Sequence, residues 1–369
     1  MVLSTDFVPA AIDRIRAAAA NGSKLRIRGG GSKDFYGETL QGDILDTTPL
    51  SGVISYEPSE LVITAMAGTP LAELEALLLA QGQCLPFEPP HFAGDSTVGG
   101  MVAAGLSGPA RASVGAVRDY VLGVKLINGK GEHLTFGGQV MKNVAGYDVS
   151  RLMVGAMGTL GLLIEISIKV LPIAPLEATL KFEMTQAEAL QKLNAWGGQP
   201  LPLNASCWLT EGGVGMLYLR LRGAKAAVES ACTKLGGQKI DNALASADWQ
   251  RARDQQLQWF TGRSAEHDLW RLSVPQTTPP LDLPGLPLLE WHGGLRWLQA
   301  APDCAEQLRQ AASAHGGHAT LFVAAGARKT TATARFDALK PPLDRIHREL
   351  KREFDPAGVF NPNRLSANW

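Results

Sequence analysis

The sequence has 369 residues, with 35 Lys and Arg side chains against 35 Asp and Glu side chains, so its formal net charge is zero. Hydrophobic residues make up 45% and charged residues 19%, which is typical of a globular protein and argues against a disordered one. The length predicts one very large domain or two ordinary ones. A neutral chain has no electrostatic reason to bind nucleic acid, and no apolar run reaches the roughly 18–20 residues that span a bilayer.

The first 20 residues do not resemble a secretory signal. Asp6, Asp13, Arg14 and Arg16 interrupt the apolar pattern, and the hydrophobic region of a signal peptide would not contain them. We therefore expect a soluble cytoplasmic protein, and any association with a membrane is expected to be peripheral, through partner subunits.

The four cysteines, Cys84, Cys207, Cys232 and Cys304, lie far apart and form no Cys-x-x-Cys pair. Iron–sulfur clusters and structural zinc sites usually use such pairs, so this chain is not expected to carry a cluster or a metal. If its function involves electrons, an iron–sulfur relay would have to lie on another protein.

The N-terminal half alternates helix and strand patterns, which indicates an α+β fold rather than a regular βαβ repeat. Thr69 and Pro70 read as the N-cap and first position of a helix, and Asn128-Gly129 reads as a two-residue hairpin turn. The predicted elements are helix 10–20, strand 24–28, strand 61–67, helix 71–81, two strands within 120–136, strand 162–171 and, near the C-terminus, helix 343–354.

The composition changes near residue 172, where the segment 172–175 (Pro-Ile-Ala-Pro) is typical of a boundary. The tryptophans lie beyond this point, and we expect most of them in the core of the second region. These patterns predict three parts: 1–172, 173–340, and a C-terminal helical segment 341–369 that returns to the first part.

A first glycine-rich loop follows directly after the strand at 24–28. Glycines here allow the backbone to turn tightly and to approach a ligand with its N–H groups. Asp34 occupies the position of the third glycine of a dinucleotide fingerprint and no helix pattern follows, which excludes a Rossmann motif. The alternative is an ordinary glycine turn. The candidate binding residues in this loop are Arg28, Gly29, Gly30, Gly31 and Ser32.

A second stretch, 94–108, interleaves glycines with small apolar residues and hydroxyls. Such a density of glycine is unfavourable in a regular core element, and it is easier to explain if backbone amides and hydroxyls contact a phosphate and a sugar. The alternative is close packing of a helix on a sheet. The candidates in this stretch are Ser96, Thr97, Gly99, Gly100, Gly105, Ser107 and Gly108.

Further motifs, combined with these two loops, carry a family resemblance. They are Pro89-Pro90-His91-Phe92, 142–148 (Lys-Asn-Val-Ala-Gly-Tyr-Asp), 151–155, 155–164, 315–320 and 354–362. Their order resembles the vanillyl-alcohol oxidase superfamily, whose FAD-binding domain is called PCMH-type. Within that superfamily the chain is similar to the FAD-binding subunits of glycolate oxidase, also called glycolate dehydrogenase, from about residue 5 to the C-terminus.

The resemblance implies a PCMH-type FAD-binding domain of two α+β subdomains over 1–172, a reduced α+β cap over 173–340, and completion of the first domain by 341–369. It also implies that the two glycine-rich stretches hold the FAD pyrophosphate and ribose. Gly158 and Gly161 would close on the adenosine side, the backbone near Ile164 would contact the adenine, and Asn361 would approach the isoalloxazine.

Departures from the family pattern matter as well. Many relatives attach FAD through a histidine in the first glycine loop, and 29–33 contains none, so FAD is expected to bind non-covalently. Met157 stands where relatives often have Glu, which removes a polar group near the cofactor. His315 and His318 could share a helix face, but no third metal ligand is evident. No residue is assigned as catalytic.

The resemblance implies an FAD-binding subunit of a complex that oxidises glycolate to glyoxylate. Its partners would be a second flavoprotein subunit with the full substrate site and an iron–sulfur subunit that passes electrons to an acceptor other than oxygen. Two alternatives are open: an autonomous FAD-dependent 2-hydroxyacid dehydrogenase of the D-lactate type, and a non-catalytic assembly subunit. The sequence does not distinguish glycolate from a related 2-hydroxyacid.

Overall fold

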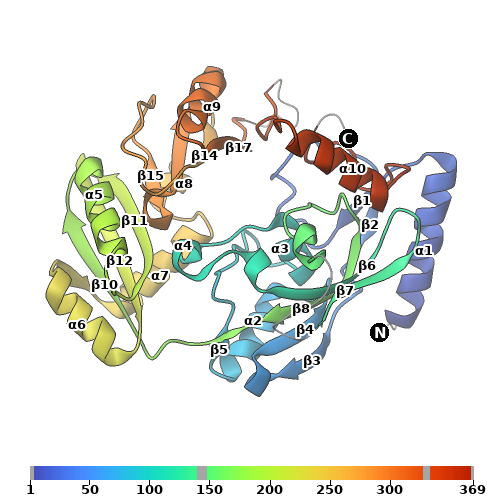
Figure 1. Cartoon of the computed structure of the whole chain (residues 1–369), viewed down its shortest axis with the longest axis horizontal. Helices are drawn as coiled ribbons and strands as arrows, with labels where there is room; N and C mark the ends of the chain where they lie inside the picture. The colour runs from blue at the N-terminus through green and yellow to red at the C-terminus, as the bar shows by residue number, and fades with distance from the viewer. Residues whose placement is uncertain (1–3, 139–147, 327–332, 367–369) are drawn as a thin grey trace. The chain divides into compact units, whose positions relative to one another are not determined.

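The computed structural model describes residues 4–138, 148–326 and 333–366. The chain divides into two compact units (Figure 1). Unit 1 comprises Met1–Leu106, Ala116–Pro172 and Ala338–Trp369, and unit 2 comprises Ser107–Gly115 and Ile173–Asp337. Among the described helices, none is long and apolar enough to cross a membrane.

Unit 1 is built on a five-stranded antiparallel sheet and a small parallel strand pair. The sheet order is β3-β4-β8-β6-β7, and β1 pairs with β2 in parallel. The bounds are α1 (Ser4–Asn21), β1 (Leu25–Arg28), β2 (Asp43–Asp46), β3 (Val53–Glu57), η1 (Pro58–Glu60), β4 (Val62–Met66), α2 (Leu71–Ala80), β5 (Gln83–Cys84), α3 (Val98–Ala104), η2 (Val117–Asp119), β6 (Val121–Ile127), β7 (His133–Gly137), η3 (Ser150–Met153), β8 (Leu162–Lys169), β9 (Leu171–Pro172) and α10 (Leu343–Phe354).

The two parts of unit 1 have separate hydrophobic cores. One core joins β4, β6 and β8 to α2 and α3, and Leu71, Leu74 and Leu78 recur at helical spacing on the buried face of α2. The other core joins α1 to β1 and to Val359 and Phe360 near the C-terminus. The C-terminal segment is thus part of unit 1, because two distant pieces of the sequence share one core.

The elements predicted in the N-terminal half are confirmed, but two local predictions are wrong. Pro70, not Thr69, occupies the N-cap of α2, and the Thr69 hydroxyl donates instead to the Gly52 carbonyl at 3.0 Å. Asn128 and Gly129 do not form a two-residue turn, because β6 and β7 are joined by a five-residue loop from 128 to 132. The Gly129 N–H donates to the carbonyl of Phe354 at 2.8 Å, so a tertiary contact shapes this loop.

Unit 2 is built on an eight-stranded antiparallel sheet with the order β13-β10-β12-β11-β15-β16-β14-β17. The mixed helix and strand content of both units confirms the α+β prediction. The bounds are α4 (Arg111–Val114), β10 (Leu176–Glu183), α5 (Gln186–Gly197), β11 (Leu203–Glu211), β12 (Val214–Gly223), α6 (Lys225–Leu235), β13 (Gln238–Ile240), α7 (Asn242–Arg253), α8 (Gln258–Thr261), β14 (Asp268–Ser273), β15 (Leu288–Glu290), η4 (Trp291–Gly293), β16 (Leu295–Ala300), η5 (Pro302–Cys304), α9 (Ala305–Ser313) and β17 (His318–Val323).

Most tryptophans lie in the core of unit 2, as predicted. Trp270 is fully buried in the cluster formed by β14, β16, β17 and α9. Trp369 lies outside the described residues. The other buried tryptophans are Trp196, Trp208, Trp249, Trp291 and Trp297.

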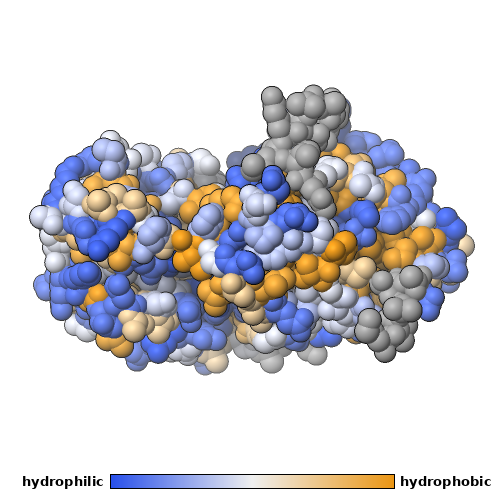
Figure 2. Space-filling view, turned by 90° about the horizontal axis from the view of Figure 1, so that it is seen from below, coloured by the Kyte–Doolittle hydropathy of each residue, from blue (hydrophilic) through white to orange (hydrophobic). Residues whose placement is uncertain are grey.

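Exposed apolar side chains occur on several elements of unit 1, among them β3 and α2. Val53 and Ile54 lie on β3, an edge strand of the five-stranded sheet, and Leu77 and Leu79 lie on α2. Figure 2 shows one face of the molecule, on which hydrophobic residues gather in bands among hydrophilic ones. Exposed apolar bands of this kind are typical of surfaces that contact other proteins.

Candidate functional site

A pocket in unit 1 brings both predicted glycine-rich stretches together. It encloses about 780 Å³ including its open mouth. Eleven predicted site residues line it. They are Arg28, Gly29, Gly30, Gly31, Ser32, Thr97, Gly99, Gly100, Gly158, Gly161 and Asn361.

Close backbone packing explains why the first loop needs glycines. A Cβ atom on Gly30 would lie 1.7 Å from the carbonyl oxygen of Asp95, and one on Gly29 would lie 2.4 Å from the Thr97 Oγ1. Gly31 adopts a φ of +81°, which other residues adopt only with strain. The glycines therefore let the two glycine-rich stretches approach each other, so their role in packing accompanies any role in binding.

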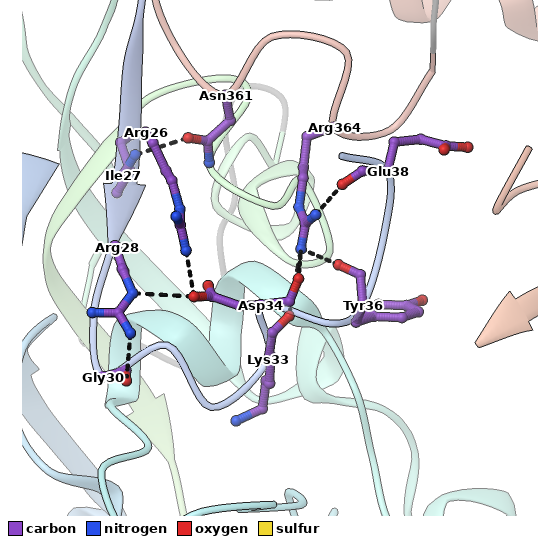
Figure 3. Close-up of polar contacts among 10 residues, drawn as sticks. All are labelled: Arg26, Ile27, Arg28, Gly30, Lys33, Asp34, Tyr36, Glu38, Asn361 and Arg364. Carbon is purple, nitrogen blue, oxygen red and sulfur yellow. Dashed lines mark hydrogen bonds and ion pairs between the residues drawn. The ribbon is translucent and has the colours of Figure 1, made fainter. Parts of the chain in front are cut away.

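An ion-pair cluster anchors the loop that follows β1. The Asp34 carboxylate accepts hydrogen bonds from Arg26 and, at 3.1 Å, from the Nε of Arg28 (Figure 3). An Nη of Arg28 lies 3.5 Å from the Gly30 carbonyl. These contacts orient the Arg28 side chain along the pocket wall.

Arg364 ties the C-terminal segment to the same loop. Its guanidinium, in a residue that is only 5% exposed, donates to the carbonyls of Lys33, Asp34, Tyr36 and Glu38 (Figure 3). The fork of N–H groups on an arginine suits several carbonyls in one curved segment. Arg364 is therefore the principal anchor of the loop 33–38.

Asn361 joins three separate segments with its side-chain amide. Its Oδ1 accepts from the Ile27 N–H at 2.8 Å, and its Nδ2 donates to the Met157 carbonyl at 2.6 Å. The Asn361 N–H also donates to the carbonyl of Leu25. The structure thus gives Asn361 a positioning role at the pocket, and its approach to the isoalloxazine stays a prediction.

Lys33 and Ser96 connect the two glycine-rich stretches through side chains. The Lys33 Nζ lies 3.2 Å from the Ser32 Oγ and 2.7 Å from the Ser96 Oγ, and 5.8 Å from the centre of the Phe92 ring. Ser96 is buried behind this contact and does not line the pocket. It supports the pocket through Lys33.

Four other predicted residues lie away from the pocket wall. Gly105 ends α3 with a φ of +63°, and Ile164 is buried in the second core of unit 1, next to Leu163, which does line the pocket. Ser107 and Gly108 belong to unit 2, where the carbonyl of Gly108 accepts from the Trp291 indole at 2.9 Å. Their predicted contacts with FAD stay predictions.

The sequence patterns missed half of the pocket wall. Arg364 and Lys33 are single charged residues without a motif, and Met157 entered only as a departure from the family pattern. The lining residues not predicted are Ile27, Lys33, Asp34, Leu40, Thr47, Ala67, Ala103, Ala104, Met157, Leu163 and Arg364.

A buried lysine holds the C-terminal segment in place within unit 1. The Lys351 Nζ donates to the carbonyls of Thr159 (2.7 Å) and Phe360 (3.0 Å) and to the Asp355 carboxylate (2.6 Å). Burial lowers the pKa of Lys351, against the opposing effect of Asp355. The segment 355–361 is therefore fixed by charged hydrogen bonds from inside unit 1.

The two histidines that the sequence singled out do not share a helix face, because α9 ends at Ser313 and His318 begins β17. In the described ranges, no group of three His, Cys, Asp or Glu side chains could hold a metal ion. Burial, with the charge of Arg271, lowers the pKa of His318, and His315 Nδ1 lies 3.1 Å from the Ala311 carbonyl. Of the motif 142–148, only Asp148 lies within the described residues.

Comparison with known proteins identifies the family. Residues 8–137 match a family described as the FAD binding domain. The chain is 44% identical over 367 residues to the Escherichia coli protein named glycolate oxidase subunit GlcE, and this match covers 100% of the chain and 99% of that protein. The chain belongs to the GlcE family. The predicted family resemblance is thereby confirmed.

More distant relatives share parts of the chain or its fold. The glycolate oxidase subunit GlcD of Bacillus subtilis is 30% identical over 131 residues, which cover 36% of this chain and 28% of that protein. A solved structure of alkyldihydroxyacetonephosphate synthase matches with a TM-score of 0.64 at 15% identity, over 95% of this chain and 74% of that one. The GlcE family chain therefore has the predicted PCMH-type fold.

Proposed function

We propose that this chain is the FAD-binding subunit of a multi-subunit complex that oxidises glycolate to glyoxylate. The proposal rests on one observation: in a GlcE family chain, the two glycine-rich stretches and the C-terminal Asn361 meet at a single pocket.

The residues of this pocket fit FAD. The cationic side chains Arg28, Lys33 and Arg364 line it with one carboxylate, Asp34, so its wall carries a net positive charge of two. A pyrophosphate carries the opposite charge and binds well to backbone N–H groups of glycine-rich turns. Arg28 to Ser32 and Thr97 to Gly100 would hold the pyrophosphate, and Gly158 to Gly161 would enclose the adenosine side.

Non-covalent binding is part of the proposal. The residues that line the pocket, all of them in the described part of the chain, include no His, Cys or Tyr. These are the side chains that could attach to a flavin ring. FAD would therefore be held by packing, hydrogen bonds and charge, and it would dissociate when the protein unfolds.

Within this arrangement the chain's own residues bind and orient the cofactor. Bound FAD would supply two-electron redox chemistry. Asn361 and Arg364 would hold β1, the loop 33–38 and the segment at Met157 in fixed positions around the bound FAD. No side chain of this chain is assigned a proton-transfer role.

Partner subunits follow from the same reasoning. The GlcD relative indicates that glycolate oxidases carry a second, related subunit, and we propose such a flavoprotein as the partner with the full substrate site. The four cysteines of this chain are all free, so an iron–sulfur relay would lie on a further subunit. Glycolate or a related 2-hydroxyacid would be the substrate of the assembly.

The test is the visible spectrum of the chain purified alone and then in the assembled complex. We expect flavin bands that vanish from the protein fraction after denaturation and filtration, because the FAD is not covalent. Anaerobic glycolate should bleach the flavin of the complex and leave that of the isolated chain unchanged. Bleaching of the isolated chain would instead identify an autonomous dehydrogenase, and a chain that takes up no added FAD would identify an assembly role.

A further inference from the structure

Unit 2 contains a second large cavity that the proposed function does not use. It encloses about 1480 Å³ including its open side, almost twice the value for the pocket of unit 1. It lies on the sheet strands β10, β11, β12 and β13 and beneath α7 and α8. All of its lining residues belong to unit 2.

The cavity exists because one face of the sheet is only partly covered. Alternate residues of β11 and β12, such as Trp208 and Leu217, pack in the core beneath α5 and α6. Their neighbours Cys207, Leu209 and Tyr218 line the cavity on the opposite face, as the two-residue period of a strand requires. On this face α7 contacts the sheet through Trp249, whose indole N–H donates to the Thr179 Oγ1 at 2.9 Å.

The walls combine flat rings with aliphatic side chains. Trp249, Trp259 and Tyr218 supply aromatic surface, and Leu209 and Ile240 supply branched apolar surface. Large aromatic side chains in a concave site favour a ligand that is itself flat and apolar. This composition distinguishes the cavity from the glycine-lined pocket of unit 1.

The charges at the cavity are already neutralised. Asp248 and Arg251 form an ion pair at 2.7 Å. Glu211 accepts from the Tyr218 hydroxyl at 2.6 Å and from Lys181 at 3.0 Å. Burial, with the nearby charges of Glu290 and Glu211, raises the pKa of the Cys207 thiol well above its ordinary value, so the thiol is uncharged. An uncharged ligand therefore matches the cavity, because a charged one would lose hydration without gaining a partner.

Two lining side chains can donate hydrogen bonds to such a ligand. In the described part of the chain, neither the Gln258 amide nor the Trp259 indole N–H donates to a protein acceptor. Both lie on α8, where Gln258 is exposed and Trp259 is half-buried. A carbonyl oxygen on the ligand could accept from them in place of water.

From these features we propose that the cavity of unit 2 binds an uncharged, flat aromatic molecule that carries a carbonyl group. The rings of Trp249, Trp259 and Tyr218 stack on the ligand, and the donors on α8 bind its carbonyl oxygen. The site is separate from the FAD pocket, so its occupancy does not depend on whether this chain holds FAD.

Equilibrium dialysis of the full chain with three small probes tests the proposal. Coumarin is flat, uncharged and carries a carbonyl; naphthalene lacks the carbonyl; coumarin-3-carboxylate adds a negative charge. We expect coumarin to bind with a Kd on the order of 0.1 mM. Naphthalene should bind about fivefold more weakly and coumarin-3-carboxylate at least tenfold more weakly. Equal binding of all three probes, or no binding of coumarin at about 1 mM, overturns the proposal.

Variants locate the binding in this cavity. Gln258→Leu removes one donor and should weaken coumarin about threefold to fivefold, without affecting naphthalene. Gln250→Leu makes the same change on an exposed, non-lining residue of α7 and serves as the matched control. Trp259→Leu should weaken both uncharged probes about tenfold. Unchanged affinities in Gln258→Leu and Trp259→Leu, with native melting temperatures, place the probe elsewhere and refute the site.

Discussion

The two cavities of this protein differ in the chemical groups that line them. Seven glycines line the pocket of unit 1, whereas Gly212 is the single glycine lining the cavity of unit 2, in the described residues. Backbone N–H groups and three cationic side chains shape the first, and aromatic side chains with paired charges shape the second. A main-chain wall suits an anionic ligand whose oxygens need many donors, and a side-chain wall suits a neutral ring.

Substituting a glycine that lines the pocket of unit 1 should have the largest effect on ligand binding. Gly30→Val places a Cβ where the Asp95 carbonyl oxygen lies, 1.7 Å away, and this backbone cannot yield as a flexible side chain would. The two glycine-rich stretches would be forced apart. We expect FAD affinity to fall by more than about 100-fold and the melting temperature to fall by several degrees. Absorbance of bound flavin and thermal unfolding measure the two effects.

Gly94→Ala is the matched control for this substitution. A Cβ on Gly94 meets nothing within 4 Å, and this glycine lies close in sequence to the Asp95 carbonyl. Flavin content and melting temperature should stay at the native values. A normal flavin content in Gly30→Val would show that close approach of the two stretches is not needed for binding.

Removing the Arg364 anchor should have the next largest effect. Arg364→Met keeps much of the side-chain volume but removes the guanidinium that donates to four carbonyls of the loop 33–38. The Lys33 carbonyl still accepts from the Tyr36 N–H. We expect a loss of about 3 kcal/mol in the free energy of unfolding and at least tenfold weaker FAD binding. Arg352→Met, on the exposed side of α10, should change neither quantity. Denaturant titration and FAD titration separate the two losses.

In unit 2, the half-buried His292 should make stability depend on pH. Burial lowers the pKa of His292 from 6.5 to about 4, and its ring nitrogens contact the hydroxyls of Ser206 and Ser113 at 3.0 Å. The unfolded chain binds this proton first as the pH falls, so stability is complete above about pH 6.5 and declines towards about pH 4, by about 3 kcal/mol.

His292→Asn tests this prediction, because asparagine tolerates the positive φ of 56° at this position. Its melting temperature should vary less between about pH 6.5 and about pH 4 than that of the native chain. His267→Asn changes an exposed histidine of the same unit and should leave the native pH profile intact. An identical slope in both variants would mean that other groups cause the decline.

The glycine-lined pocket of unit 1 could be predicted in part from the sequence, and the aromatic cavity of unit 2 could not. Glycines at Gly29 to Gly31 and Gly99 to Gly100 are costly unless close approach requires them, so their spacing is informative. Asn361 was found through its motif. Arg364 was not, because its four acceptors lie more than 320 residues earlier in the chain.

The cavity of unit 2 has no local signal at all. Cys207 and Tyr218 come from strands, and Trp249 and Trp259 from two helices, so only the tertiary arrangement brings them together. The sequence predicts that most tryptophans lie in the core of the second region, and Trp249 is buried. One face of the sheet is only partly covered because of the position that α7 takes. The periodicity of the sequence does not predict that position.

The smallest expected effect is that of a substitution in one cavity on the affinity of the other cavity for its ligand. If each cavity binds its ligand independently, Trp259→Leu should leave the affinity for FAD within twofold of the native value. Gly30→Val should likewise leave the affinity for coumarin within twofold. The reason is that no residue lines both cavities, and each cavity lies within one compact unit. Paired titrations of FAD and coumarin on the two variants provide the measurement, with the native chain as reference. A loss of both affinities in either variant, measured well below its melting temperature, would mean that the two cavities are energetically coupled.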